Sequence, residues 1–138
     1  MAQTIKAEAK IKKIPIVQAD KFMLNNKLWG FEDYHAEVYA QIAYDDQGFL
    51  VKFFVGESNP LVEKTHHFQE VCQDSCVEFF VKSPEGEGYF NFEINCAGTA
   101  LAAFRRSRED ADHFDEAKIS QIRRFGSLEH KPHDSRGE

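Results

Sequence analysis

Two glutamates in the middle of the chain have the residue type and the spacing to do chemistry. Glu78 and Glu93 lie on two alternating segments between positions 75 and 96, joined by a stretch rich in turn residues. If Lys82 pairs with Tyr89 in an antiparallel hairpin, the two carboxylates face each other across the strands. Directly opposed like charges destabilise a sheet by about 0.2–1 kcal/mol. We therefore expect a cation, an arginine or a shared proton between them.

Further polar side chains share this face of the predicted hairpin. Tyr89, Asn91 and Asn95 flank the two glutamates in this pairing. Planar donors and acceptors on a rigid surface suit sugar hydroxyls, which need paired hydrogen-bonding groups. The strip therefore favours saccharide binding. A solvated face on which Glu78 and Glu93 splay apart explains the pattern equally well, and a two-residue shift of the pairing would separate them.

The same carboxylates raise an enzymatic alternative. Retaining glycosidases hold a nucleophile and an acid/base carboxyl about 5 Å apart, which is close to the separation of opposed residues in a sheet. Glu78 and Glu93 would take those two roles. No third acidic residue follows at alternate spacing on either segment. We therefore expect binding without catalysis.

Aromatic side chains outside the hairpin could complete a sugar site. Trp29 is the only tryptophan, and it precedes Gly30 in a predicted loop, where its flat ring could stack on a sugar. Tyr34 and Tyr39 could extend that platform. The alternative is that Trp29 closes the hydrophobic core.

Two hairpins dominate the predicted fold. Residues 35–44 alternate between apolar and polar positions, a turn follows, and residues 49–57 form a second strand. Gln41 is expected on the polar face of the first hairpin. The expected core positions of the two hairpins are Ala36, Val38, Ala40, Ile42, Tyr44, Phe49, Val51, Phe53, Val55, Val77, Phe79, Val81, Phe90, Phe92 and Ile94.

Shorter elements are expected around these hairpins. Residues 1–34 suggest an edge strand followed by a loop, residues 99–104 a short strand, and residues 118–128 a last strand. The acidic stretch 109–116 is typical of a solvated loop or short helix. Short strands in meander order, with no sustained helical period, predict an all-β fold, an antiparallel β-sandwich of the immunoglobulin or jelly-roll kind.

Several residues have the chemistry of metal ligands. Asp74 offers carboxylate oxygens to calcium. His66, His67, Cys72 and Cys76 are zinc-ligand types, but their spacing matches no standard finger, and free cysteines are usually small buried apolar residues.

The charge balance excludes some partners. A formal net charge of −6, with acidic residues throughout, gives no electrostatic footprint for nucleic acid or an anionic membrane. Arg105, Arg106 and Arg108 form a basic cluster that could contact an anionic sugar or phosphate. No apolar run reaches signal-peptide or membrane-spanning length, and three cysteines make no disulfide framework. We expect a cytoplasmic protein, with an exported origin left open.

Two stretches resemble a known family. Residues 73–81 (Gln-Asp-Ser-Cys-Val-Glu-Phe-Phe-Val) and 88–101 (Gly-Tyr-Phe-Asn-Phe-Glu-Ile-Asn-Cys-Ala-Gly-Thr-Ala-Leu) resemble the signature hairpin of bacterial family-9-like carbohydrate-binding proteins. These proteins are related to the family 9 modules attached to xylanases. The resemblance extends back through residues 35–57 and Trp29 and forward to residues 123–128, so it covers most of the chain.

This resemblance implies a β-sandwich that binds sugar ends between aromatic rings and carries structural calcium. Matched by position, Trp29 is the stacking residue, and the second aromatic wall has no match here, which puts specificity for reducing ends in doubt. The residues that match the polar motif of the family are Asp74, Glu78, Asn91, Glu93 and Asn95.

The resemblance also bears on the end of the chain. The family pattern continues into further strands with a Trp-x-Leu motif, whereas this sequence stops at Glu138. We expect one sandwich domain over residues 1–125, truncated at its C-terminus, and a polar tail over residues 126–138 that begins missing sequence. An exposed sheet edge would then allow pairing with a second copy as a homodimer.

The predicted function is non-catalytic binding of a mono- or oligosaccharide of the xylan or cellulose type. A protein-interaction or structural sandwich without sugar binding is the alternative, and a glycoside hydrolase is the third possibility. The predicted ligand-binding residues are Trp29, Tyr39, Glu78, Tyr89, Asn91, Glu93 and Asn95, with Asp74 as a calcium ligand.

Overall fold

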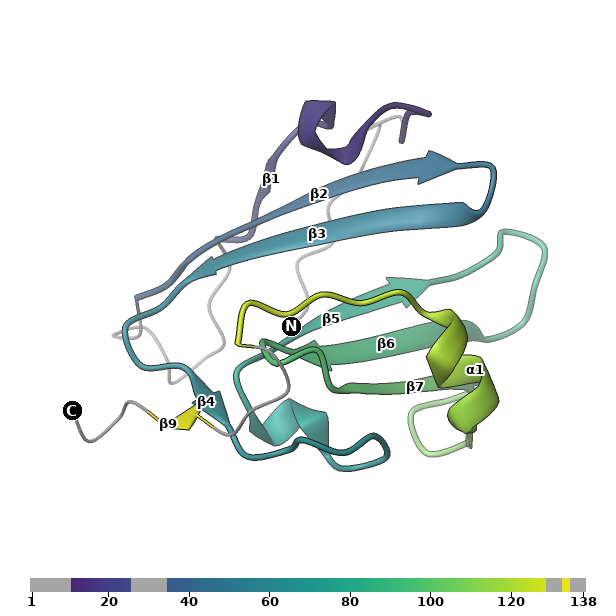
Figure 1. Cartoon of the computed structure of the whole chain (residues 1–138). Helices are drawn as coiled ribbons and strands as arrows, with labels where there is room; N and C mark the ends of the chain where they lie inside the picture. Colours follow the sequence, from purple (N-terminus) through teal and green to yellow (C-terminus); the bar gives the residue numbers. More distant parts are fainter. Residues whose placement is uncertain (1–10, 26–34, 129–132, 135–138) are drawn as a thin grey trace. The chain divides into compact units, whose positions relative to one another are not determined.

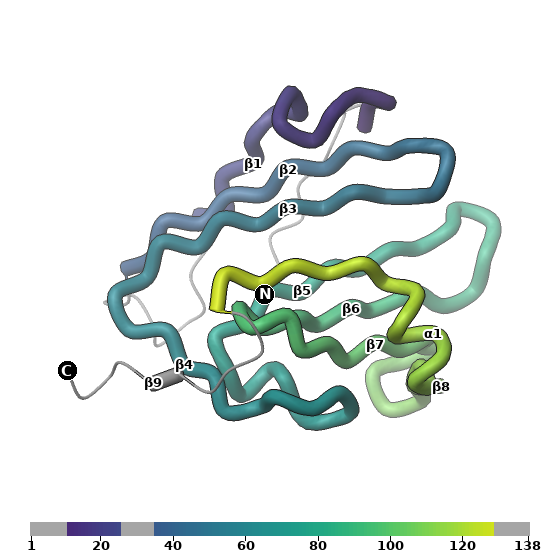
Figure 2. The backbone as a smooth tube through the Cα atoms, viewed as in Figure 1, coloured from purple at the N-terminus to yellow at the C-terminus, as the bar shows by residue number. Residues whose placement is uncertain are grey.

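The computed structural model describes residues 11–25, 35–128 and 133–134 of the chain. The chain consists of two compact units, residues 1–58 and residues 59–138. Figure 1 shows the strands of both units, and Figure 2 traces the backbone in the same view.

The first unit is built on the hairpin predicted between residues 35 and 57. Its sheet has the order β1-β2-β3, with antiparallel neighbours. The Asp45 carboxylate accepts hydrogen bonds from the backbone N–H groups of Gln47 and Gly48, at 2.7 and 3.1 Å, which closes the turn. The elements are η1 (Ile16–Gln18), β1 (Phe22–Met23), β2 (Glu37–Asp45) and β3 (Gly48–Gly56).

The faces of this hairpin differ in part from the expectation. Gln41 is only 3% exposed, because its Nε2 donates to the carbonyl of Ala19, at 2.9 Å, in the segment that follows η1. Phe49, Val55 and Tyr44, predicted to face the core, are exposed. The N-terminal segment therefore covers a strand face that alternation alone assigns to solvent.

The second unit contains the hairpin that carries Glu78 and Glu93. Its main sheet has the order β5-β6-β7-β8, and β4 pairs separately with β9. The predicted register is confirmed, because Glu78 pairs with Glu93 and Phe80 pairs with Asn91. The elements are β4 (Leu61–Val62), η2 (Val71–Gln73), β5 (Cys76–Val81), β6 (Tyr89–Asn95), β7 (Ala100–Arg105), β8 (Ala111–His113), α1 (Glu116–Gln121) and β9 (His133–Asp134).

One helix packs on the apolar face of this sheet. Ile119 of α1 is buried against Ala100 and Ala102 of β7, whose small side chains let the helix approach closely. Figure 2 follows the chain from β7 through β8 into α1. The Asp115 carboxylate caps the helix by accepting from the N–H of Lys118 at 3.0 Å.

Two assignments near the C-terminus need correction. The strand predicted over residues 118–128 is wrong, because α1 occupies 116–121 and the chain continues to 128 without strand structure. Part of the predicted polar tail, His133–Asp134, forms β9. The described residues thus form two main antiparallel sheets, the short β4–β9 pair and one α-helix, and the predicted all-β sandwich class is confirmed. The domain boundary at residue 125 stays a prediction.

A buried polar cluster fixes the loop before β5. The side chain of Asn95, 2% exposed, donates from Nδ2 to the Lys64 carbonyl at 2.8 Å and to the Asp74 carboxylate at 3.0 Å. Its Oδ1 accepts from the backbone N–H groups of Ala97 and Thr99, at 3.1 and 3.0 Å. Both donors and both acceptor positions of this amide are therefore used within the fold.

Asp74 completes this cluster. Its two carboxylate oxygens accept from the N–H groups of Glu63 and Lys64, at 3.0 and 2.8 Å, and Asp74 is itself buried. Loop 63–74 is thereby joined to the end of β6 through Asn95.

The turn between β5 and β6 yields a test of the hairpin. Gly88 has φ +89°, and an added Cβ would lie 2.6 Å from the Arg105 carbonyl oxygen and 2.7 Å from the Phe104 ring. We expect Gly88→Ala to lower the free energy of unfolding by about 2–4 kcal/mol. Gly86→Ala, whose Cβ would meet only Ser83 at 3.4 Å, should cost less than about 1 kcal/mol. Urea unfolding measures both, and equal stability of the two variants would contradict this account.

Asn95 offers a test that separates support of the fold from ligand contact. We expect Asn95→Ala to lower the free energy of unfolding by about 2–4 kcal/mol, because it leaves buried polar partners unsatisfied. Asn59→Ala, at an exposed loop position, should change stability by less than about 0.5 kcal/mol. Thermal unfolding of both variants measures the difference. Unchanged stability of Asn95→Ala would show that this side chain does not hold the loop.

Candidate functional site

A pocket of about 400 Å³ opens on the polar face of the β5–β8 sheet. Its volume lies within the usual range for small-molecule sites, about 300–1,000 Å³. Three of its residues come from loop 68–72 and four from strands β6, β7 and β8. The lining residues are Phe68, Glu70, Cys72, Glu93, Leu101, Arg105 and His113.

The strand register brings the floor of this pocket together. Glu93 of β6 pairs with Leu101 of β7, and Ala103 of β7 pairs with His113 of β8. Arg105 lies two residues beyond Ala103, so alternation places its side chain on the same face. The floor thus joins an acidic, an apolar and a basic side chain on a rigid sheet.

The loop that forms the wall carries an unusual backbone conformation. Phe68 has φ +74°, which is rare for a bulky residue, and its side chain is 50% exposed at the pocket. The neighbouring His67 accepts from the N–H of Ala100 at 3.2 Å, and Arg124 Nη2 lies 3.1 Å from its Nε2. These contacts fix the strained residue beside the sheet, and such strain is concentrated at functional sites.

The two opposed glutamates give the site its electrostatic character. Burial raises the pKa of both Glu78 and Glu93 above the ordinary range of a carboxyl group, and the charge of Glu78 raises that of Glu93 further. The positive charge of Arg105 lowers the pKa of both carboxyls, but by less. The two carboxylates are thus influenced by one arginine, which lies on the neighbouring strand β7 and compensates their charges only in part.

Arg105 is itself held by the fold. Its Nε donates to the side-chain carbonyl of Asn91 at 3.2 Å, and its Nη1 donates to the backbone carbonyl of Arg108 at 2.9 Å. Asn91 is 3% exposed, and its Nδ2 has no acceptor in the part of the chain that the structure describes. Asn91 therefore orients Arg105, while both N–H donors of its own Nδ2 stay unused among the described residues.

The predicted site residues fall into three groups. Glu78, Tyr89, Asn91 and Glu93 share the polar face, as expected, and of these Glu93 lines the pocket. Asn95 is turned into the loop cluster described above, where it has no donor or acceptor left for a ligand.

The remaining two predicted residues are Tyr39, in β2 of the first unit, and Trp29. Tyr39 stacks on Phe54 with ring centroids 5.0 Å apart, and the Lys21 ammonium lies 4.7 Å from the centre of its ring. Trp29 lies outside the described residues. Their part in sugar binding stays a prediction.

Sequence reasoning missed most of the pocket wall. Phe68, Glu70 and Cys72 lie in a loop without periodicity, and a left-handed phenylalanine has no sequence signature. Arg105 was recognisable as part of a basic cluster, although its position beside the glutamates depends on the pairing of β6 with β7. The contact between the rings of Phe80 and Tyr89, whose centroids lie 5.9 Å apart, was also not predicted from the sequence.

The described side chains are poorly suited to hold a metal ion. The Asp74 carboxylate is already surrounded by three N–H donors, so it does not fit as a calcium ligand. No group of three or more histidine, cysteine or acidic side chains forms a metal site among the described residues. Burial raises the pKa of Cys76 to about 12, which keeps this thiol protonated and unreactive at neutral pH.

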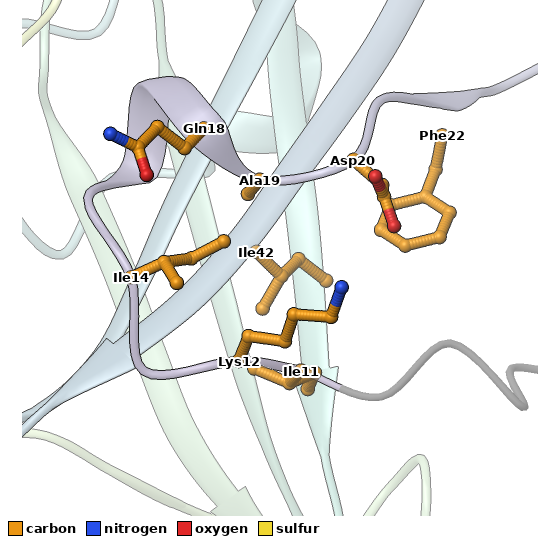
Figure 3. A pocket seen from close by; sticks show the side chains of 8 residues that line it. All are labelled: Ile11, Lys12, Ile14, Gln18, Ala19, Asp20, Phe22 and Ile42. Carbon is orange, nitrogen blue, oxygen red and sulfur yellow. The ribbon is translucent and has the colours of Figure 1, made fainter.

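The first unit has a smaller hollow, which Figure 3 shows. Ile14 and Ile42 lie close together beneath η1, with Lys12 beside them, and the cavity measures about 20 Å³. A space of this size holds about one water molecule, so it excludes a sugar.

No helix among the described residues is long and apolar enough to cross a membrane.

Comparisons with known proteins connect this geometry to a family. The comparison with curated proteins gave no match. Among solved structures, a candidate carbohydrate-binding protein from Bacteroides uniformis ATCC 8492 superposes with a TM-score of 0.77 and 28% identity. The match covers 84% of this chain and 53% of that protein, so the chain spans about half the length of its structural relative. The sequence pattern of carbohydrate-binding family 9 matches residues 10–138, nearly the whole chain, and this protein therefore belongs to that family.

Proposed function

We propose that this protein binds a mono- or oligosaccharide, without catalysis, in the pocket between loop 68–72 and the polar face of β6–β8. The observation that carries the proposal is the convergence of an exposed aromatic ring, a carboxylate and a guanidinium on one pocket. Membership of a carbohydrate-binding family supports it.

The chemistry of these groups fits a sugar. A carboxylate such as that of Glu93 accepts two hydroxyl hydrogen bonds, and the guanidinium of Arg105 donates several in one plane. The exposed ring of Phe68 offers a flat apolar surface to the C–H face of a pyranose. Because the floor lies on paired strands, these groups are oriented before the ligand arrives, which reduces the entropic cost of binding.

Several finer points belong to the same proposal. We expect glycans of the xylan or cellulose type as ligands, and a part for Trp29 and Tyr39 in sugar binding stays a prediction from the sequence. Structural calcium, held elsewhere than at Asp74, a cytoplasmic location and a homodimer formed through a sheet edge are parts of the same working hypothesis.

The aromatic wall gives the direct test. We expect Phe68→Ala to weaken sugar binding about five- to tenfold, because it removes a stacking surface worth about 1 kcal/mol. Calorimetric titration with glucose, xylose, cellobiose and xylobiose measures the affinity. Phe125→Ala is the matched control, since Phe125 is 91% exposed and does not line the pocket. Equal loss in both variants, or none in Phe68→Ala, would place the sugar elsewhere.

A hydrolase is the second candidate, because Glu78 and Glu93 do face each other and burial raises the pKa of each. We nevertheless expect no cleavage, since Glu78 does not line the pocket beside Glu93. Prolonged incubation with xylan and cellulose oligomers, followed by an assay for new reducing ends, measures this. Release of sugar that disappears in both Glu78→Gln and Glu93→Gln would instead establish a glycosidase.

A further inference from the structure

We propose that the pocket selects saccharides that carry an ammonium group, such as amino sugars with a free amine, over neutral sugars, and that it rejects uronic acids. This inference rests on the proposed function, because it names the substrate class of the same pocket. It comes from the balance of charge on the pocket and from the contacts that its charged groups already make.

Acidic groups outnumber basic ones at this site. Glu70 and Glu93 line the pocket, and Glu78 lies opposite Glu93 on the neighbouring strand. Among the residues that line the pocket, Arg105 is the one with a permanent positive charge. No salt bridge to Glu78 or Glu93 occurs within the described part of the chain. The pair therefore has room for a positive charge supplied by a ligand.

The one arginine is poorly placed to reverse this balance. Arg105 uses Nε on Asn91 and Nη1 on the Arg108 carbonyl, which leaves Nη2 as its free end. A uronate that approached Nη2 would bring its carboxylate into the pocket that Glu93 and Glu70 also line, where the like charges repel each other. An anionic sugar is thus disfavoured even though a guanidinium lines the pocket.

An organic ammonium fits this environment better than a metal ion does. Calcium requires six to eight oxygen ligands, and the described residues form no group of three candidate ligands. A primary ammonium has three donors and is satisfied by one or two carboxylates together with solvent. In an amino sugar the ammonium group is attached to a ring whose C–H face can lie on Phe68. Such a ligand would therefore contact both the aromatic wall and the acidic floor of the pocket.

Matched sugars test the proposal on the intact chain. Glucosamine and N-acetylglucosamine differ from glucose at C2, where one carries an ammonium group and the other a neutral acetamide, whereas glucuronate differs from glucose at C6, where it carries a carboxylate. Calorimetric titration near pH 6.5, where most of the amine is protonated because its pKa resembles that of an α-amino group, should show glucosamine binding about tenfold more tightly than glucose. N-acetylglucosamine, which keeps the nitrogen but lacks the charge, should lose this advantage, and glucuronate should bind at least tenfold more weakly than glucose. The advantage should shrink at high salt.

Two variants link the selectivity to the glutamates. In Glu93→Gln the ratio of glucosamine to glucose affinity should fall to about twofold or less, because the neutral amide keeps the shape of the side chain. Glu85→Gln removes the same charge from the exposed β5–β6 turn and should leave the ratio unchanged.

The outcomes separate this inference from the function on which it rests. If glucose or xylose binds and glucosamine has no advantage, or if Glu85→Gln removes the advantage as fully as Glu93→Gln does, the charge selectivity is wrong. If none of the sugars binds, the proposed function itself fails.

Discussion

The antiparallel ladder between β5 and β6 determines which side chains of these two strands reach the polar face of the sheet in the second unit. Alternation along β6 sends Phe90, Phe92 and Ile94 to one face and Tyr89, Asn91 and Glu93 to the other. A shift of one residue in this pairing would exchange the two faces, and a shift of two would separate the paired glutamates. The pocket, the position of Arg105 and the packing of α1 all depend on the register observed here.

The apolar face, not the polar face, sets that register. Phe90 and Phe92 both contact Phe114, with ring centroids 6.2 and 5.9 Å apart. A fully buried phenylalanine contributes about 1.5–3 kcal/mol. Phe92 is partly buried and Phe90, predicted to lie in the core, is 40% exposed, so each contributes less than this. Each aromatic pair adds about 0.5–1.5 kcal/mol. The opposed glutamates cost about 1 kcal/mol at most. Because the apolar contribution is the larger of the two, the like charges of Glu78 and Glu93 are tolerated on opposed positions of the sheet.

The hairpin and its register could be predicted from the sequence, because alternation and a turn rich in Gly and Pro are local signals. The predictions that were wrong concern residues whose surroundings depend on contacts between segments far apart in the sequence. Gln41 is buried because the Ala19 carbonyl meets its amide, and Phe68 reaches the pocket through a backbone conformation without a sequence signature. Residues 123–128 match the family pattern, yet they form no strand; Gly126 instead passes so close to residues 96–98 that a Cβ would lie 2.3 Å from the Cys96 carbonyl oxygen. Such close approaches of backbone follow from tertiary structure alone.

The polar motif therefore contains residues with two different tasks. Asn91 and Glu93 belong to the face that carries the pocket, whereas Asp74 and Asn95 are saturated by hydrogen bonds within the fold. The loop that Asp74 and Asn95 hold continues directly into Phe68, Glu70 and Cys72, the wall of the pocket. Loss of either buried residue would weaken the attachment of that wall to the end of β6, so the proposed binding would weaken although neither side chain lines the pocket. Residues that match a binding motif can thus act by positioning the site, and the hydrogen bonds of each side chain distinguish this role from direct contact.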